Sequence, residues 1–508
     1  MQVRIKGVAR WESSIIKLLG LIEMILAIAL IFPAVVAIYY GENSLVFLYP
    51  VPFLLILGAF QYIFFKSGES LKPASGMLMM FIAWWIAFLV SALPYYLYGF
   101  SFIDSLFESV SGFTATGATI FSNATTPQSL LFWMAFTQWA GGIAIIVIFL
   151  FLMPMMGIGG RTILNNELAG SEMGNFSMRI KNAVWNFVII YVVLTLVGAM
   201  LLIGYGESIY SSLTLMFSTI STGGFLANAD SMADFPFFVQ LVVVVFMFLG
   251  STNFYLHYRA LKRRNFSVYK NNQEFIWTII WFLFVTVVLI AILVSINGYV
   301  NISDFGNTVW DSFFTVVSMG TSTGFTIMGQ SYWPIAAYVI LWVVMSFGSG
   351  AGSTSAGIKI YRIMILKSYI SNGIYKSFHP RAVRDVKIDG HPLSGYAVTS
   401  AIVLISLFFF TIIVSTIFIL ISEPGMDITN SLGLSVAALG NSGANMGTAA
   451  WQGLNSISMI FMMFVMWAGR LEMLSLMMFT GTFWSDLVKD LKGNRSAAKS
   501  RNAKNRKI

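Results

Sequence analysis

The 508-residue sequence contains no cysteine and few charged residues. Without thiols it has neither a disulfide framework nor a thiolate metal site. Its three histidines, His257, His379 and His391, are too scattered to indicate another metal site. Charged residues make up 10% of the chain and hydrophobic residues 57%, against about 25% charged in an average globular protein. This composition excludes a soluble enzyme and a disordered chain, and it predicts a protein whose solvent is lipid.

Ten apolar runs are long enough to cross a bilayer. A hydrocarbon core of roughly 30 Å requires about 20 helical residues, and a helix satisfies its own backbone hydrogen bonds in lipid. We therefore expect an all-α integral membrane protein. Its spans are expected near residues 15–40, 46–65, 77–98, 129–156, 183–204, 236–258, 275–297, 333–367, 394–421 and 454–486.

Lysine and arginine are absent from every second connection between these runs. The segments near 41–45, 99–128, 205–235, 298–332 and 422–453 contain none of the 30 basic residues. Positively charged loops stay in the cytoplasm, so this alternation predicts that both termini are cytoplasmic. The basic tail, residues 489–508, is expected to be a disordered cytoplasmic segment that anionic lipid headgroups attract.

Four of the segments without basic residues repeat one pattern. Each has a serine followed twelve residues later by a glycine, in the pairs Ser105 and Gly117, Ser211 and Gly223, Ser312 and Gly324, and Ser431 and Gly443. The apolar stretch between serine and glycine is too short to cross a bilayer. Small-residue contacts between helices are the alternative explanation of such dipeptides, but four copies in register form an internal repeat.

The repeat predicts four re-entrant loops, each with a short helix and an extended end. Asp104, Asp311 and Asn430 are expected to be N-caps of three of these helices. Non-helical backbone at membrane depth is tolerated where it lines a water-filled path, and rings of backbone carbonyls can replace the hydration shell of K⁺. The expected ion-binding residues are Thr114, Ala115, Thr116, Gly117, Ile220, Ser221, Thr222, Gly223, Thr321, Ser322, Thr323, Gly324, Gly440, Asn441, Ser442 and Gly443.

These motifs resemble the Trk/Ktr/HKT potassium transporter superfamily, and most closely its Trk-type membrane subunit. GSTNFYLHYR (250–259) and GRLEML (469–474) are similar to further family motifs. In that family, glycine at the first filter position of every unit accompanies potassium selectivity. The resemblance implies an N-terminal transmembrane helix pair, four helix–pore-loop–helix repeats around one pore, and a tail. The implied boundaries are 1–72 for the helix pair, 73–160, 161–265, 266–388 and 389–488 for pore repeats 1 to 4, and 489–508 for the basic tail.

Arg470 is the one basic residue deep inside an expected span. An ionisable group at that depth is costly and indicates a function. If the helix lines the pore, Arg470 places a positive charge in the path of a cation and acts as an electrostatic barrier, the role that the family resemblance also implies. A structural arginine paired with Glu472 or with helix-end carbonyls is the alternative.

The eighth run is interrupted by the sequence SFGSGAGSTSAG, residues 346–357. Glycine and serine weaken helices, so a broken helix is expected, with Gly348, Gly350, Gly352 and Gly357 in its gap. The family resemblance implies an intramembrane loop there that obstructs the pore. A phosphate-binding loop is excluded because Gly357-Ile358-Lys359 lacks the required Gly-Lys-Ser/Thr order. Close helix contact through small residues remains the alternative.

The sequence thus predicts potassium uptake across the plasma membrane through a carbonyl-lined filter. A sodium-selective or sodium-coupled transporter of the same fold is the alternative. An integral-membrane lipid enzyme is less favoured, because the sequence presents no nucleophile, base or metal constellation. A transporter with inverted repeats would need repeats of alternating orientation. The resemblance implies a homodimer and a cytosolic nucleotide-binding regulatory subunit. K⁺ is the expected transported ion, and neither an organic cofactor in this chain nor nucleic acid is expected.

Overall fold

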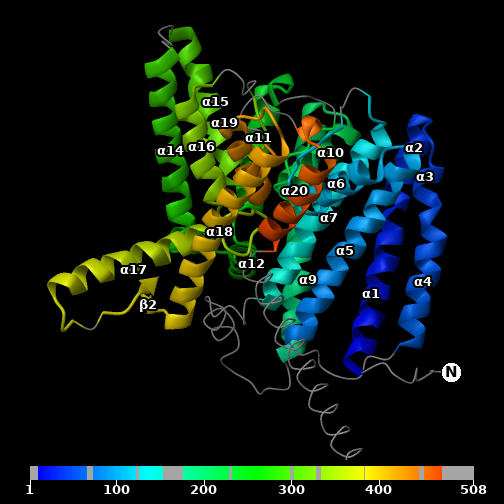
Figure 1. Ribbon diagram of the computed structural model, residues 1–508, viewed down its shortest axis with the longest axis horizontal. Coiled ribbons are helices and arrows are strands. Elements are labelled where there is room, and N and C mark those ends of the chain that lie inside the picture. The colour runs from blue at the N-terminus through cyan, green and yellow to red at the C-terminus, as the bar shows by residue number, and fades with distance from the viewer. Residues whose placement is uncertain are drawn as a thin grey trace, which may run out of the picture.

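The structure is a computed structural model that describes residues 10–65, 73–121, 125–152, 176–227, 232–297, 302–327, 333–382, 384–388, 390–444 and 451–471. It is all-α, as expected, apart from a two-stranded antiparallel ribbon of β1 (Lys387–Ile388) and β2 (His391–Pro392). The basic tail lies outside the described residues. Figure 1 shows the long helices running side by side, with α17 projecting sideways from their lower end.

Seven stretches of helix in the described part of the chain are long and apolar enough to cross a membrane, and they match seven of the ten expected spans. Among them, α1 (Arg10–Ala29) and α2 (Ile31–Tyr40) together form one stretch, α3 (Leu45–Leu48) and α4 (Pro50–Phe64) together form another, and each of the remaining five is one helix. These five are α5 (Pro73–Tyr98), α7 (Gln128–Leu152), α9 (Phe176–Tyr205), α14 (Gln273–Asn297) and α18 (Gly395–Ser422).

Two of the three remaining spans depart from a single straight helix, and the third is described only in part. The sixth was expected to be continuous over 236–258, and this is wrong: it bends by 95° between α11 (Phe237–Gly250) and α12 (Phe254–Arg263). The Asn253 side chain caps α12 by accepting a hydrogen bond from the Tyr255 N–H. The eighth is broken between α16 (Ile335–Ser346) and α17 (Ile360–Phe378), as expected. The tenth is described as α20 (Ser456–Arg470) and Leu471.

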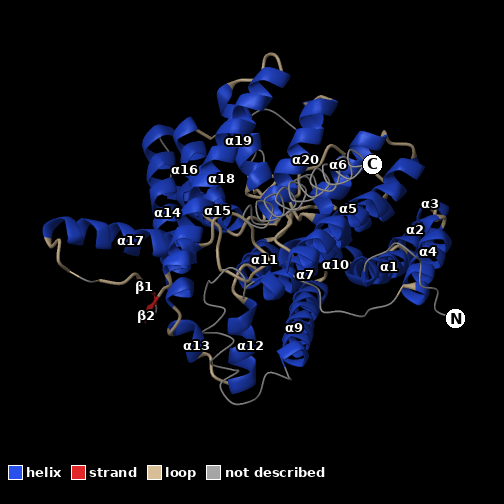
Figure 2. Cartoon of the chain, turned by 60° about the horizontal axis from the view of Figure 1, so that its bottom comes forward, coloured by secondary structure: helices blue, strands red, loops and turns tan. Residues whose placement is uncertain are grey.

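Three helices follow one another four times: a first helix of 25 to 30 residues, a middle helix that we call the short helix, and a third helix of 12 to 25 residues. The short helices are α6 (Phe102–Phe113), α10 (Ile209–Ile220), α15 (Ile302–Gly320) and α19 (Ile428–Leu439). Each short helix packs on the third helix of the preceding unit: α10 on α7, α15 on α11, α19 on α16 and, closing the circle, α6 on α20. Figure 2 shows these helices gathered around the middle of the molecule, with α1 to α4 at one side.

The short helices begin at residues other than those expected. Ser101 and Ser208 cap α6 and α10 by accepting hydrogen bonds from the backbone N–H groups of Asp104 and Ser211, and Asp427 caps α19. The N-cap prediction for Asp104 and Asn430 was therefore wrong by three residues, and Asp311 lies inside the longer helix α15. A serine oxygen at N-cap serves the same backbone donors as a carboxylate, so residue type alone did not locate the cap.

Candidate functional site

A segment of four residues leaves the C-terminal end of each short helix, and we call residues 114–117, 221–224, 321–324 and 440–443 the return segments. Their second residues, Ala115, Thr222, Ser322 and Asn441, are left-handed, with φ between 48° and 58°. The third residue donates its N–H to the helix carbonyl five residues earlier, at 2.8 to 3.0 Å. This Schellman arrangement is the usual way to end a helix, and here it turns all four chains in the same way.

The fourth residue of each return segment is a glycine with positive φ. These residues are Gly117, Gly224, Gly324 and Gly443, with φ of 79°, 76°, 84° and 58°. In the second segment the matching residue is thus Gly224 and not Gly223, and the matching serine is Ser212. Ile220 is correspondingly the last residue of α10. The sequence has two consecutive glycines at this point, so the twelve-residue spacing could be placed in either of two registers.

The four glycines form a closed ring of contacts. A Cβ added to Gly117 would overlap the carbonyl oxygen of Gly223, and one added to Gly224 would overlap that of Thr323. The same relation holds between Gly324 and Ser442, and between Gly443 and Thr116. Each glycine therefore lies against the backbone of the next unit, and the first and fourth units, more than 300 residues apart in sequence, close the ring. Glycine is required here both by φ and by space.

The return segments differ in how their carbonyl oxygens are used. In segments 114–117 and 321–324, no carbonyl oxygen accepts a hydrogen bond from any residue that the structure describes. In the other two segments some do: Gly223 accepts from Gln138 Nε2 at 2.7 Å and Gly443 from Trp451 Nε1 at 2.9 Å. The first and third segments also share a threonine pair, with hydroxyl oxygens 2.7 Å and 2.8 Å apart. The hydrogen bonds and side chains around the ring therefore follow twofold symmetry, in which the first and third segments are alike, more closely than fourfold symmetry.

Two buried amides and an acid hold the return segments in place, and of these only Asn441 was among the residues expected from the sequence. Gln138 comes from α7 of the first unit and bonds to the second segment, whereas Asn441 Nδ2 donates to Thr116 Oγ1 at 2.8 Å and so joins the fourth unit to the first. Glu108, in α6, accepts hydrogen bonds from the Thr119 hydroxyl at 2.8 Å and the Ile120 N–H at 2.6 Å, just beyond Gly117. Gln138 could have been found in the sequence, because it is a polar residue inside an apolar run.

The gap between α16 and α17, residues 347–359, folds into a compact buried loop, which we call the intramembrane loop. The Ile358 N–H donates to the Ser346 carbonyl at 2.8 Å, so the loop closes on its own starting point. Gly348 lies directly against the carbonyl of Ala356, and Gly352 and Gly357 have φ of 75° and 76°. The expected glycines thus serve the folding of the loop.

Thr354 connects this loop to two other units. Its hydroxyl lies 3.0 Å from the carbonyl oxygen of Ile220 and 2.9 Å from that of Gly250, and so meets the end of α10 and the break of the second unit. Its carbonyl accepts a 2.7 Å hydrogen bond from Arg470 Nη1. Sequence reasoning singled out the glycines of this stretch and missed its threonine. The loop also meets the third return segment, because the Ala356 N–H donates to Ser322 Oγ at 2.9 Å.

Arg470 is 2% exposed and lies at the end of α20. Its Nε and Nη2 atoms have no hydrogen-bond partner among the described residues, and the expected alternative partner, Glu472, lies outside them. The structure thus brings together Arg470 and the intramembrane loop, two features that the sequence analysis selected on separate grounds.

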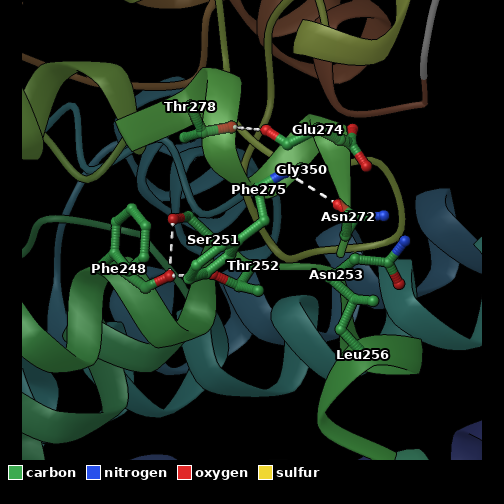
Figure 3. Close-up of a pocket in the computed structure, with 10 residues that line it drawn as sticks. All are labelled: Phe248, Ser251, Thr252, Asn253, Leu256, Asn272, Glu274, Phe275, Thr278 and Gly350. Carbon is green, nitrogen blue, oxygen red and sulfur yellow. Dashed lines mark hydrogen bonds between the residues drawn. The ribbon is translucent and has the colours of Figure 1, made fainter. Parts of the chain in front are cut away.

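A second anchor of the loop comes from the start of α14. The buried Glu274 accepts a 2.7 Å hydrogen bond from the Ala351 N–H, and Lys359 and Arg362 interact with its carboxylate electrostatically. Figure 3 shows the pocket formed where Glu274, Gly350 and the α11–α12 break at Ser251 to Asn253 meet. The loop is therefore held by the second, third and fourth units at once.

This fold and site define a class of protein: a helical membrane protein that crosses the bilayer several times and has four re-entrant units in one chain. The comparisons with known proteins give the family. The family model described as "TrkH: Cation transport protein" matches residues 79–484, and the chain belongs to this family.

Relatives and a solved structure agree along nearly the whole chain. The chain is 29% identical over 487 residues to the Trk system potassium uptake protein TrkH of Salmonella typhimurium, covering 93% of this chain and 99% of that protein. It is 30% identical over 490 residues to an uncharacterized cation transporter of Methanocaldococcus jannaschii, covering 94% and 98%. The crystal structure of the potassium transporter TrkH from Vibrio parahaemolyticus matches with a TM-score of 0.84 at 28% identity, covering 93% and 99%.

Proposed function

We propose that the protein takes up K⁺ across the plasma membrane through a filter formed by the four return segments. The observation that carries the proposal is the closed ring in which Gly117, Gly224, Gly324 and Gly443 each contact the next unit. Such a ring brings four strips of peptide oxygens around one axis, and carbonyl oxygens of this kind can replace the hydration shell of K⁺. The potassium uptake proteins among its relatives support the choice of ion.

The intramembrane loop and Arg470 act as the gate in this proposal. The loop contacts the second and third units next to their return segments, and Arg470 bonds to its Thr354 carbonyl. A buried guanidinium with two unpartnered nitrogens beside a cation path repels the cation until the loop moves. The expected glycine-rich sequence supplies the backbone freedom for that movement.

The charge of the loops gives the proposed orientation of the protein in the membrane. With the basic connections in the cytoplasm, both termini lie inside, and the return segments are reached from outside. We further propose a homodimer that works with a cytosolic nucleotide-binding regulatory subunit. The domain boundaries expected from the sequence are retained in this proposal, with a first unit beginning at residue 73.

Cation uptake by the purified protein in liposomes tests the proposal. Uptake of K⁺ and Rb⁺ is expected to exceed uptake of Na⁺, and serine at any one of the four ring glycines is expected to abolish or reduce this preference. Uptake of Na⁺ equal to or above that of K⁺ would instead identify the sodium-selective alternative. No uptake of any cation, with normal folding of the protein, would refute the function.

A further inference from the structure

A cavity of about 500 Å³ lies between the start of α14, the helix α17 and the segment 384–388, away from the return segments. Its lining contains three cationic side chains, Lys367, Arg384 and Lys387, and no Asp or Glu. The Lys367 ammonium lies 4.1 Å from the centre of the Trp277 ring, so the cation is held at the wall of the cavity by a cation–π contact. The site thus favours an anion.

Two hydrogen-bond donors without a partner among the described residues also indicate an anionic ligand. Asn372 is 6% exposed, and its Nδ2 has no hydrogen-bond partner among the described residues. The indole Nε1 of Trp281 is buried and unpartnered in the same way. Both residues line the cavity. Buried donors are nearly always satisfied, so two orphaned donors beside three cations indicate a ligand that supplies acceptor oxygens.

Most of the remaining lining is apolar, beside the polar residues Gln273, Ser368 and Ser371. Trp277 and Trp281 lie in the first turns of the α14 span, and Phe347 and Ile363 add to the same wall. Next to the cavity, α17 exposes Ile370, Ile374 and Phe378 by 51%, 57% and 78%. An exposed apolar face on a helix that leaves the bundle sideways (Figure 1) is typical of a segment that lies at the bilayer surface.

We propose that this cavity binds one anionic phospholipid, with its phosphate at Lys367, Arg384 and Asn372 and its acyl chains along Trp277 and Phe347. Basic pockets between helices at the cytoplasmic surface bind anionic headgroups, and the volume lies within the range of ordinary ligand sites. A soluble phosphate would satisfy the cations and donors and would leave the aromatic wall without a partner. The proposal is independent of the ion that the protein transports.

Native mass spectrometry of the full-length protein with added phosphatidylglycerol or phosphatidylcholine tests this. One phosphatidylglycerol is expected to bind more tightly than phosphatidylcholine. The double variant Lys367→Gln/Arg384→Gln is expected to weaken the first phosphatidylglycerol about tenfold or more, because each basic residue near a headgroup contributes about fivefold. The matched control is Lys376→Gln/Arg381→Gln, which removes two exposed charges nearby that do not line the cavity. Equal weakening in both double variants, or equal binding of the two lipids, would overturn the proposal.

A second measurement separates the lipid from other occupants. Phosphatidylglycerol with brominated acyl chains is expected to quench tryptophan fluorescence, and Trp277→Phe is expected to remove part of that quenching while leaving the protein folded. Binding of inorganic phosphate without such quenching would assign the cavity to a soluble anion and overturn the lipid. A change of dimer mass in Lys367→Gln/Arg384→Gln, with lipid binding intact, would assign the face to a second copy of the chain and equally overturn it.

Discussion

The guanidinium of Arg470 donates a 2.7 Å hydrogen bond to the backbone carbonyl of Thr354, 116 residues away. The bond joins the last described helix, in the fourth unit, to the intramembrane loop of the third. Because it uses a backbone acceptor, it depends on the position of the loop and not on the side chain at residue 354. Movement of the loop breaks it, so this bond links the charge of the proposed gate to the loop conformation.

Replacement of the arginine is expected to open the path. In Arg470→Ala the charge and the bond to Thr354 are both lost, so cation flux into liposomes should rise above that of the unchanged protein. The matched control is Arg381→Ala, an exposed arginine outside the bundle, which should leave the flux unchanged. A lower flux in Arg470→Ala, with a thermal melting temperature close to that of the parent, would contradict an electrostatic barrier.

Thr354 provides a test of the loop that spares the arginine. Thr354→Val keeps the shape and removes the hydroxyl that lies against the carbonyls of Ile220 and Gly250. Gly250 still accepts from the Thr354 N–H, so the cost is about 1 to 3 kcal/mol for the carbonyl of Ile220. The loop should then leave its place more often, and flux should increase. Thr354→Ser keeps the hydroxyl and should behave like the parent. Equal flux in all three proteins would show that the loop does not limit conduction.

The register of the second return segment gives a paired prediction. Gly224 has positive φ and lies against the Thr323 carbonyl, whereas at Gly223 a Cβ would meet the Gln138 side chain, with its Cδ 2.5 Å away. A side chain can move and a backbone carbonyl in the ring cannot, so Gly224→Ala should reduce K⁺ flux far more than Gly223→Ala. The backbone penalty at Gly224 alone is about 1 kcal/mol. The opposite ranking in a liposome flux assay would restore the register expected from the twelve-residue spacing.

Gln138 is expected to influence selectivity. Its Nε2 donates to the Gly223 carbonyl, so Gln138→Leu frees that oxygen and leaves the second segment without its support. The ratio of Rb⁺ to Na⁺ uptake should fall. Gln240 is a comparable buried glutamine in α11. Its Nε2 donates to the carbonyls of Met232 and Phe235 and its Oε1 accepts from Trp310 Nε1, away from the return segments, so Gln240→Leu should affect stability and leave the ratio unchanged. If both variants keep the parent ratio, the carbonyl of Gly223 plays no part in selection.

Sequence patterns predicted the architecture well, because membrane burial imposes long apolar runs and the repeats share one spacing. The break of the eighth span was predicted, but the bend of the sixth was not. The 95° bend after Gly250 falls at the small polar residues Ser251, Thr252 and Asn253, and Asn253 caps α12 by a local hydrogen bond from the Tyr255 N–H; such a polar triplet does not by itself determine whether a helix bends. The choice between Gly223 and Gly224 was likewise undetermined, since it depends on which glycine meets Thr323 in a neighbouring unit.

The residues of the candidate site likewise divide into those that the sequence identifies and those that only the folded structure identifies. The glycines and Arg470 stood out because a small residue in a repeat and a charge in an apolar helix are visible in one dimension. Thr354 did not, and Asn441 was expected only as part of a filter strip, because each of these side chains makes a hydrogen bond to a residue more than 100 positions away. Such partners become identifiable only when the four units are assembled.

The contact of each ring glycine with the following unit has a consequence for the ancestry of the chain. If the four units descend from copies of one gene segment, they could diverge freely in their outer helices, but a new side chain at one ring glycine collides with a neighbour encoded elsewhere in the gene. A compensating change would have to arise in a different copy. A change at one of these four positions therefore cannot be accommodated within its own unit alone.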